Sequence, residues 1–296
     1  MRATAFFGWF FSIGGVFGAL GSCRGAPTSA GTRATALGVA GAAGAAGPAV
    51  EDSGTRSGTA TATVGERALP PLLGVAWIEH LELEEGREAY VTPVIGAREP
   101  RPLIVAVHGA GDRAEWSCGG WRMVASEYAF VVCPQGLKMG GMRFGWDSAE
   151  TIRKRVKSAV AAARARFGEY IAEGPTLFVG FSQGATLAAP TLLDPEQPFP
   201  YVGLAEGGYD LIRNQRFLGQ LRGRGVQRML LACGTPVCFT SMKRAQPNFD
   251  KAQIELLIGG DPRSGHNLNG EMQAGLQRVW PAFVAGLPNW RGFKGR

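Results

Sequence analysis

Continuous apolar runs that end in turn residues recur along the chain after residue 100. They are rich in valine, isoleucine, leucine and phenylalanine, and they alternate little with polar residues. Such runs indicate strands that are buried on both faces, as in a parallel sheet. The runs lie at residues 103–108, 129–133, 177–181, 201–204, 229–233 and 254–258.

A helix and a hairpin extend this pattern. Apolar residues at 152, 156, 160, 163 and 167 keep helical spacing, and Ser148 or Thr151 would cap a helix that runs to Gly168. Residues 76–83 and 89–94 alternate well enough to predict an antiparallel hairpin at the sheet edge. The whole pattern predicts an α/β fold, a mostly parallel central sheet with helices on both faces. No long insertion follows residues 201–204, so we expect no large cap domain.

The first 70 residues have a different composition. Residues 3–22 form an apolar stretch after Arg2 that ends in small residues, which is typical of a secretory signal peptide over residues 1–22; a retained membrane anchor is the competing interpretation. Leu20-Gly21-Ser22-Cys23 resembles a bacterial lipobox, in which Cys23 would carry a lipid. We therefore expect an exported protein, either secreted or attached to the bacterial envelope membrane through a lipidated Cys23.

Residues 23–70 consist mainly of alanine, glycine, threonine, serine and proline. A segment with so few large apolar side chains cannot offset the entropy lost on ordering, so it predicts a flexible tether. Residues 71–296 are then one catalytic or binding domain. The oligomeric state is left open by the sequence.

The charge pattern excludes some classes of partner. The formal net charge is +7, but the basic residues are scattered along predicted helix faces without interleaved aromatic residues, so we expect no nucleic-acid partner. No glycine-rich phosphate loop with its lysine follows a strand, which argues against nucleotide binding. The cysteines lack C-x-x-C spacing and have no histidine near either pair, so we expect no metal site.

The strand predicted at 177–181 ends in Gly180-Phe181-Ser182-Gln183-Gly184. In G-x-S-x-G a strand turns sharply into a helix, and glycine on either side of the serine lets the two backbones pass closely. The turn would raise the Ser182 hydroxyl above the sheet, and the Gln183 amide would donate to a developing oxyanion. This pattern is typical of a nucleophile elbow.

From residue 71 onward, the order of motifs resembles the phospholipase/carboxylesterase branch of the α/β-hydrolases. HGAGD at 108–112 follows one strand, CPQG at 133–136 follows the next, and Trp146-Asp147 precede a helix before the elbow. The chain is also similar to the secreted polyester depolymerase and feruloyl esterase group. The resemblance implies an α/β-hydrolase fold and a cofactor-free serine hydrolase of carboxylic esters or thioesters. It places the amides of Gly109 and Ala110 in the oxyanion hole beside that of Gln183.

The sequence contains three histidines, and His266 is the expected base. It follows the last predicted strand, where this fold places its base after the serine and the acid. His80 lies in the predicted edge hairpin and is expected to be solvated, and the ring of His108 is expected to be structural.

The catalytic acid is where the sequence departs from the resembled family. Relatives usually carry G-x-x-D after the strand at 229–233, and Val237 occupies the aspartate position here. An acid after the preceding strand would keep the Ser, acid, His order, and Asp210 is preferred to Glu206 because it lies farther beyond the strand end. Two alternatives stay open: a backbone carbonyl or Asp250 orients His266, or the domain is a pseudoenzyme.

Cysteines and aromatic residues complete the expectations. Cys118, Cys133, Cys233 and Cys238 allow three pairings in an exported protein, and Cys118–Cys133 with Cys233–Cys238 would each close a local loop. Aromatic residues in segments that leave strand ends predict a substrate pocket, with Trp116, Trp121 and Trp146 as its candidates.

These patterns predict an exported serine esterase that acts through an acyl-enzyme on small-molecule or polymeric esters. The alternative is a catalytically impaired binding or structural envelope protein that kept the fold and lost the acid.

Overall fold

The computed structural model describes residues 68–295 of the chain. The predicted signal segment and nearly all of the predicted tether lie outside the described residues. At the end of the predicted tether, Leu69 donates its amide to Arg98 O at 2.8 Å and Pro70 O accepts from the Tyr170 hydroxyl at 3.0 Å.

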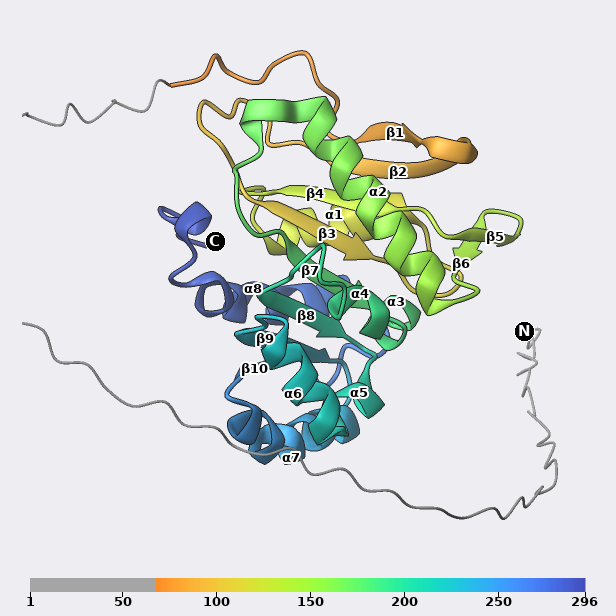
Figure 1. Ribbon diagram of the computed structural model, residues 1–296, viewed down its shortest axis with the longest axis vertical. Helices are drawn as coiled ribbons and strands as arrows, with labels where there is room; N and C mark the ends of the chain where they lie inside the picture. The colour runs from red at the N-terminus through yellow and green to blue at the C-terminus, as the bar shows by residue number, and fades with distance from the viewer. Residues whose placement is uncertain (1–67, 296) are drawn as a thin grey trace, which may run out of the picture. The chain divides into compact units, whose positions relative to one another are not determined.

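An eight-stranded sheet forms the centre of the described domain (Figure 1). The pairs β1–β2 and β2–β4 are antiparallel, and every later pair is parallel. Across the sheet the strands are β1 (Glu79–Leu83), β2 (Arg87–Thr92), β4 (Phe130–Pro134), β3 (Leu103–Val107), β7 (Leu177–Phe181), β8 (Tyr201–Ala205), β9 (Arg228–Cys233) and β10 (Glu255–Gly260). The expected runs and the edge hairpin therefore all form strands, and β3, β4, β7 and β8 are buried at every position.

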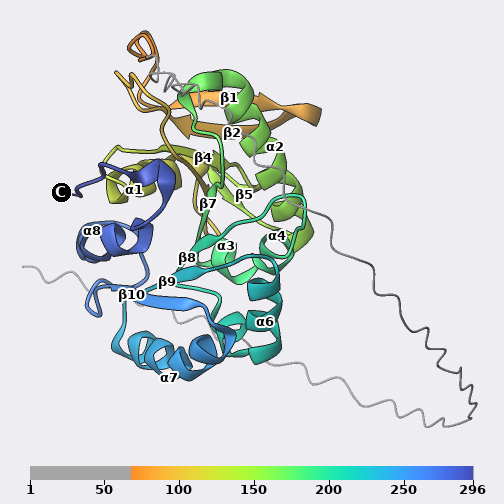
Figure 2. The same cartoon turned by 60° about the vertical axis from the view of Figure 1, so that its left-hand side comes forward.

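Helices cover both faces of this sheet (Figure 2). On one face lie α1 (Ala114–Val124) and α8 (Gly270–Val284), which pack over a core that includes Trp121 and Trp280. The other face carries α2 (Ala149–Phe167), α3 (Gln183–Thr186), α4 (Ala189–Leu192), α5 (Tyr209–Arg213), α6 (Gln215–Gly223) and α7 (Pro236–Ala252). Short 3₁₀ turns occupy Glu84–Gly86, Gly168–Tyr170 and Pro288–Trp290.

Helix α2 begins and ends where its sequence predicts. The Ser148 hydroxyl accepts from the Thr151 amide at 3.1 Å, which caps the first turn, and Gly168 ends the helix with φ 47°. Its predicted apolar stripe is buried against the sheet.

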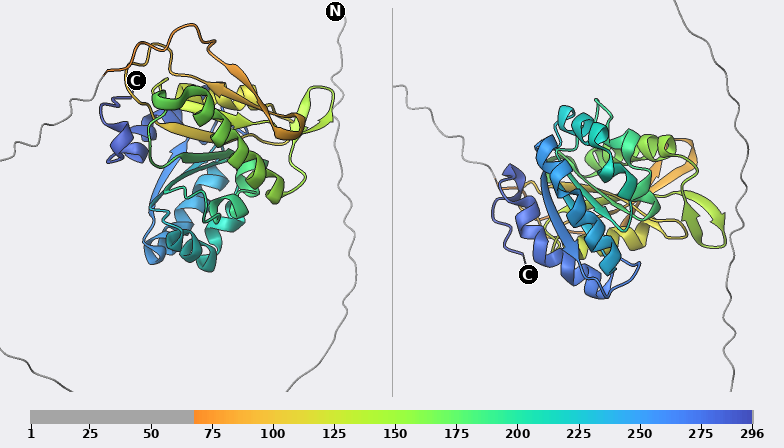
Figure 3. Two further views of the ribbon diagram at one scale, coloured as in Figure 1. Left: turned by 45° about the horizontal axis from the view of Figure 1, so that its top comes forward. Right: turned by 90° about the horizontal axis from the view of Figure 1, so that it is seen from below.

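A small hairpin was not predicted. Strands β5 (Leu137–Gly140) and β6 (Arg143–Gly145) pair outside the main sheet and project from the domain beside α2 (Figure 3). No large cap covers the sheet, and none of the helices within residues 68–295 is long and apolar enough to span a membrane. Because the sheet order, the parallel pairing and the two helical layers are those of the α/β-hydrolase fold, the expected fold is confirmed.

Candidate active site

Ser182 lies at the junction between β7 and α3. Its backbone has φ 51° and ψ −114°, a conformation that residues other than glycine rarely adopt. A Cβ on Gly180 would lie 2.9 Å from Ala185 backbone atoms, and one on Gly184 would lie 2.5 Å from Val107 O. Both glycines are therefore required by close backbone approach, as the elbow pattern predicts.

His266 lies in the loop between β10 and α8, and its ring faces Ser182. Its Nε2 atom is 2.8 Å from Ser182 Oγ, within hydrogen-bonding distance for proton transfer. The Phe181 ring packs beside the imidazole, with 5.2 Å between the ring centroids. The structure thus brings the expected nucleophile and the expected base together.

The third member of the cluster is Glu206 and not Asp210. Glu206 follows β8 directly, its side chain is buried, and its Oε2 lies 3.2 Å from His266 Nδ1. Asp210 is exposed on α5, four residues beyond. The preference for Asp210 assumed that a position farther from the strand end reaches farther into the site. The left-handed backbone at Glu206, φ 55°, instead turns the nearer carboxylate toward the histidine.

The other candidates for the acid lie elsewhere. Val237 is in the first turn of α7 and is 78% exposed. Asp250 lies in the last turn of the same helix, where its Oδ1 accepts from Gln246 Nε2 at 2.8 Å. Neither residue takes the place of Glu206 beside His266.

Backbone amides beside Ser182 are available for an oxyanion. The amides of Gly109, Ala110 and Gln183 donate to no other residue within the described part of the chain, whereas that of Gly111 donates to Phe144 O at 2.7 Å. Gly109 contributes by its small size: a Cβ there would be 3.0 Å from Ser182 Cβ and 3.1 Å from the Phe181 ring. The arrangement is suited to hold negative charge next to Ser182 Oγ.

His108 holds the segment that carries Gly109 and Ala110. The ring is buried, its Nδ1–H donates to Gly109 O at 2.8 Å, and its Nε2 accepts from the Gly136 amide at 2.9 Å. These contacts select one neutral tautomer. Burial lowers the pKa of His108 below its usual value, outweighing the backbone bond to Gly109 and the charge of Asp112. The structural role expected for this ring is in keeping with these contacts.

A cleft of about 670 Å³ opens beside the catalytic cluster. Of the three tryptophans expected to line it, Trp116 does so, with 64% of its surface exposed. Trp121 is fully buried and packs against Trp280, and Trp146 is buried with its indole N–H donating to His108 O at 2.9 Å. These two were misassigned because residue type and position after a strand do not determine which way a helix or loop turns its rings.

Other residues also line the cleft. They come from the segment before β1, from the loop after β3, from α1, from the loop that follows His266 and from the start of α8. Gly111 and Asp112 belong to the HGAGD motif, and the others carried no sequence signal: Trp77, Glu115, Gly119, Gly120, Met123, Asn267, Leu268, Asn269 and Gln273. Burial raises the pKa of Asp112 at the cleft wall.

The Gln183 side chain has a role that the motif alone did not indicate. Its Oε1 accepts from the Trp146 amide and its Nε2 donates to Trp146 O, both at 2.9 Å. This paired contact fixes the elbow to the loop before α2, so that the Gln183 backbone amide keeps its direction.

Both local disulfides are formed. Cys118 on α1 is bonded to Cys133 on β4, and Cys233 at the end of β9 is bonded to Cys238 in α7. Glu206 lies close to the second pair, within the spacing of a metal site, but the two sulfurs are bonded to each other and are not thiolate ligands.

No protein-family model and no curated protein matches the sequence. Among solved structures, the chain is similar to esterase PE8, at 23% identity and a TM-score of 0.48, with 66% of this chain and 95% of that chain covered. It is similar to the Bacillus cereus carboxylesterase at 16% identity and a TM-score of 0.45, covering 68% and 96%. It is also similar to a ferulic acid esterase at 13% identity and a TM-score of 0.47, covering 70% and 96%.

The order Ser182, Glu206, His266 along the chain follows the ends of β7, β8 and β10. This is the order in which the α/β-hydrolase fold carries its nucleophile, acid and base. Together with the sheet order, it shows that the described domain has the α/β-hydrolase fold.

Proposed function

We propose that the protein is a serine hydrolase that cleaves carboxylic esters through an acyl-enzyme. The observation that carries this proposal is the continuous chain of contacts from Ser182 Oγ to His266 Nε2 at 2.8 Å and from His266 Nδ1 to Glu206 Oε2 at 3.2 Å. A hydroxyl is a weak nucleophile at neutral pH, and such a chain is the means by which it is activated.

In the acylation step, Ser182 Oγ attacks the ester carbonyl carbon while His266 Nε2 takes the hydroxyl proton. The amides of Ala110 and Gln183 hold the oxyanion of the tetrahedral intermediate. The carbon–oxygen bond to the alcohol then breaks, and His266 returns the proton to the departing alkoxide. The products of this step are the alcohol and an acyl ester on Ser182.

Deacylation repeats the sequence with water. His266 takes a proton from the water as its oxygen attacks the acyl carbon, and gives that proton to Ser182 Oγ as the acid leaves. The Glu206 carboxylate orients Nδ1–H of the imidazole and stabilises the imidazolium that forms in both steps.

The shape of the cleft supports short acyl groups or a polymer surface as substrate. No large cap closes over Ser182 in the described domain, and His266 itself is exposed enough to be reached from solvent. The walls carry the aromatic side chains of Trp77, Trp116 and Phe181. An open apolar cleft holds a small or chain-like ester better than it encloses a long lipid.

Ser182→Ala tests this function in purified protein, with Ser158→Ala as the matched control. Ser158 lies on α2, its hydroxyl donates to Lys154 O at 3.2 Å, and it is not among the residues that line the cleft. We expect Ser182→Ala to lower turnover of short p-nitrophenyl esters by about 10⁶-fold and Ser158→Ala to leave it unchanged. Turnover that survives in Ser182→Ala would favour the alternative, a binding or structural protein with adventitious activity.

We further propose that the protein is exported and that its mature form begins at Cys23, which carries a lipid. The support is the apolar stretch at 3–22 with its lipobox-like end, together with two disulfides, which persist in oxidising compartments. Mass spectrometry of the N-terminal peptide from membrane and soluble fractions tests this. A diacylated Cys23 in the membrane fraction is expected, and an intact Met1 would contradict export.

A further inference from the structure

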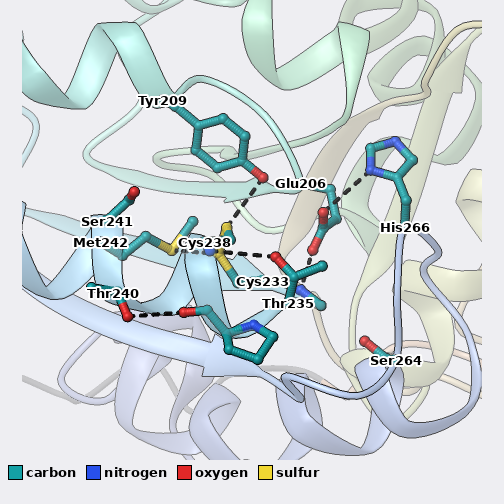
Figure 4. The surroundings of a disulfide bond; sticks show 12 residues. Glu206, Tyr209, Cys233, Thr235, Cys238, Thr240, Ser241, Met242, Ser264 and His266 are labelled. Carbon is teal, nitrogen blue, oxygen red and sulfur yellow. Dashed lines mark hydrogen bonds and ion pairs between the residues drawn. A yellow bond between two sulfur atoms is a disulfide. The ribbon is translucent and has the colours of Figure 1, made fainter.

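The disulfide between Cys233 and Cys238 lies directly against the catalytic acid (Figure 4). It joins the last residue of β9 to the first turn of α7, with 5.7 Å between the two Cα atoms. This is the loop on which the resemblance led us to expect an aspartate, and its Val237 side chain points to solvent. The loop therefore contacts the acid instead of supplying it.

Gly234, inside that loop, connects the acid to the histidine segment. Its amide donates to Glu206 Oε1, and its carbonyl accepts from the Gly265 amide at 3.0 Å, one residue before His266. A side chain at this position would overlap Gly265 O and the Ser264 hydroxyl. The position of Gly234 thus fixes one carboxylate oxygen of Glu206 while the other oxygen faces His266.

Tyr209 provides a second link between the disulfide and the acid. Its hydroxyl lies 3.1 Å from Cys238 Sγ and is close to Glu206 in the same view (Figure 4). Burial, followed by the charge of Glu206 and a hydrogen bond to it, raises the pKa of Tyr209 to about 12. The phenol is therefore a neutral donor to the carboxylate at physiological pH.

Few other contacts hold the loop. Within the described residues, Thr235 caps α7 by accepting from the Cys238 amide at 3.3 Å, and Gly234 bonds to Glu206 and to Gly265. Only Gly234 and Thr235 lie between the end of β9 and the start of α7, and glycine gives this junction backbone freedom. The disulfide restricts that freedom at the point where the Gly234 amide meets Glu206.

We propose that the Cys233–Cys238 disulfide is a positioning element for the catalytic acid, which holds Gly234 and Tyr209 so that Glu206 aims its second oxygen at His266. The inference rests on the proposed esterase function, because its effect is felt through the Ser182–His266 pair. Neither cysteine touches the reacting atoms. Opening the disulfide lets the carboxylate turn away from the imidazole, which slows proton transfer without altering the cleft.

The second disulfide of the same domain supplies a matched control. Cys118–Cys133 joins α1 to β4, and both cysteines are buried. Replacing this pair with alanine therefore also removes two sulfur atoms from a buried site. In the Cys233→Ala/Cys238→Ala protein we expect kcat for a short ester to fall by about 10- to 100-fold, with KM within about twofold of wild type. The Cys118→Ala/Cys133→Ala protein is expected to keep kcat within about twofold. Equal losses in the two proteins, or a loss confined to KM, would overturn the proposal.

A double-mutant cycle with Glu206→Gln separates positioning from general damage. If the disulfide acts through Glu206, its removal from the Glu206→Gln protein costs kcat no more than about twofold further, because the group being positioned is already gone. A merely structural role predicts the same 10- to 100-fold loss in both backgrounds. That additive result would overturn the proposal.

If the alanine variants do not fold, the effects of opening the two disulfides can be compared in wild-type protein. A phosphine reductant converts each disulfide to two thiols and is itself oxidised to the phosphine oxide with oxygen from water. After graded treatment, alkylation and peptide mapping give the fraction of each pair opened. Activity that falls with the opening of Cys233–Cys238 supports the proposal, and activity that follows Cys118–Cys133 contradicts it. Untreated wild type without Ser182-dependent turnover would instead refute the proposed function itself.

Discussion

His266 Nε2 lies 2.8 Å from Ser182 Oγ, although 84 positions separate the two residues in the chain. The contact arises because parallel strands direct their carboxyl ends to one edge of the sheet, where β7 ends in the elbow and β10 leads into the histidine loop. Glu206 reaches the same edge from β8. The sheet topology therefore brings the three residues of the site together, and substitutions at these residues are expected to change activity.

Glu206 and Asp210 make a matched pair of acidic residues. Glu206→Gln keeps the size of the side chain but removes the charge that fixes the imidazole tautomer, so we expect kcat to fall by about 10⁴-fold. Asp210→Asn removes the same charge from an exposed position on α5, and kcat is expected to change by less than about twofold. Steady-state kinetics on a short ester measures both, and a larger loss in Asp210→Asn would reverse the assignment of the acid.

His108 predicts a pH dependence of stability. Since burial lowers its pKa in the folded state, the unfolded chain binds a proton at His108 more readily below about pH 6.5. The free energy of unfolding that neutral His108 contributes is therefore present above this pH and is lost as the pH falls. Protonation would also set Nε2–H against the Gly136 amide.

The urea midpoints of wild type and His108→Gln, measured from pH 7.5 to 4.5, isolate that contribution. We expect wild type to be the more stable protein at pH 7.5 and its advantage to shrink as the pH falls. An advantage that stays constant or grows toward acid pH would show that His108 does not titrate as its burial requires.

The elbow glycines predict a steric effect on stability. Gly184→Ala would bring a Cβ to 2.5 Å from Val107 O and 2.7 Å from His108 O, and we expect it to lower the free energy of unfolding by at least about 2 kcal/mol. Gly219→Ala is the control, because nothing lies within 4 Å of a Cβ there. In the middle of α6 this change should stabilise by about 0.5–1 kcal/mol. Denaturation curves that rank the two substitutions oppositely would contradict the close approach at the elbow.

Much of the fold was predictable because buried parallel strands leave long apolar runs and Ser182 is flanked by glycines at fixed spacing. The direction of a side chain was harder to predict. Asp210 and Trp121 have suitable residue types at suitable positions, yet one faces solvent and the other faces the core. Glu206 reaches His266 from a left-handed backbone conformation, and no local sequence pattern predicts that conformation at a glutamate.

Trp116 and Trp121 separate substrate binding from folding. Trp116 is 64% exposed in the cleft, so Trp116→Ala is expected to raise KM several-fold for esters with aromatic or longer acyl groups and to leave the melting temperature unchanged. Trp121 is fully buried, and Trp121→Ala should cost about 3–5 kcal/mol of unfolding free energy. A stable Trp121→Ala protein with a raised KM would place that ring in the cleft after all.

Covalent labelling of Ser182 by a fluorophosphonate, followed by intact-mass and peptide mass spectrometry, tests the central claim most directly. The phosphonyl group reacts only with an activated hydroxyl, so labelling reports the Ser182–His266–Glu206 chain itself. We expect one adduct in wild type, located on Ser182, absent from Ser182→Ala and formed far more slowly in Glu206→Gln. A folded wild-type protein that gains no adduct, or gains it on another residue, would contradict the assignment of this site as a serine hydrolase.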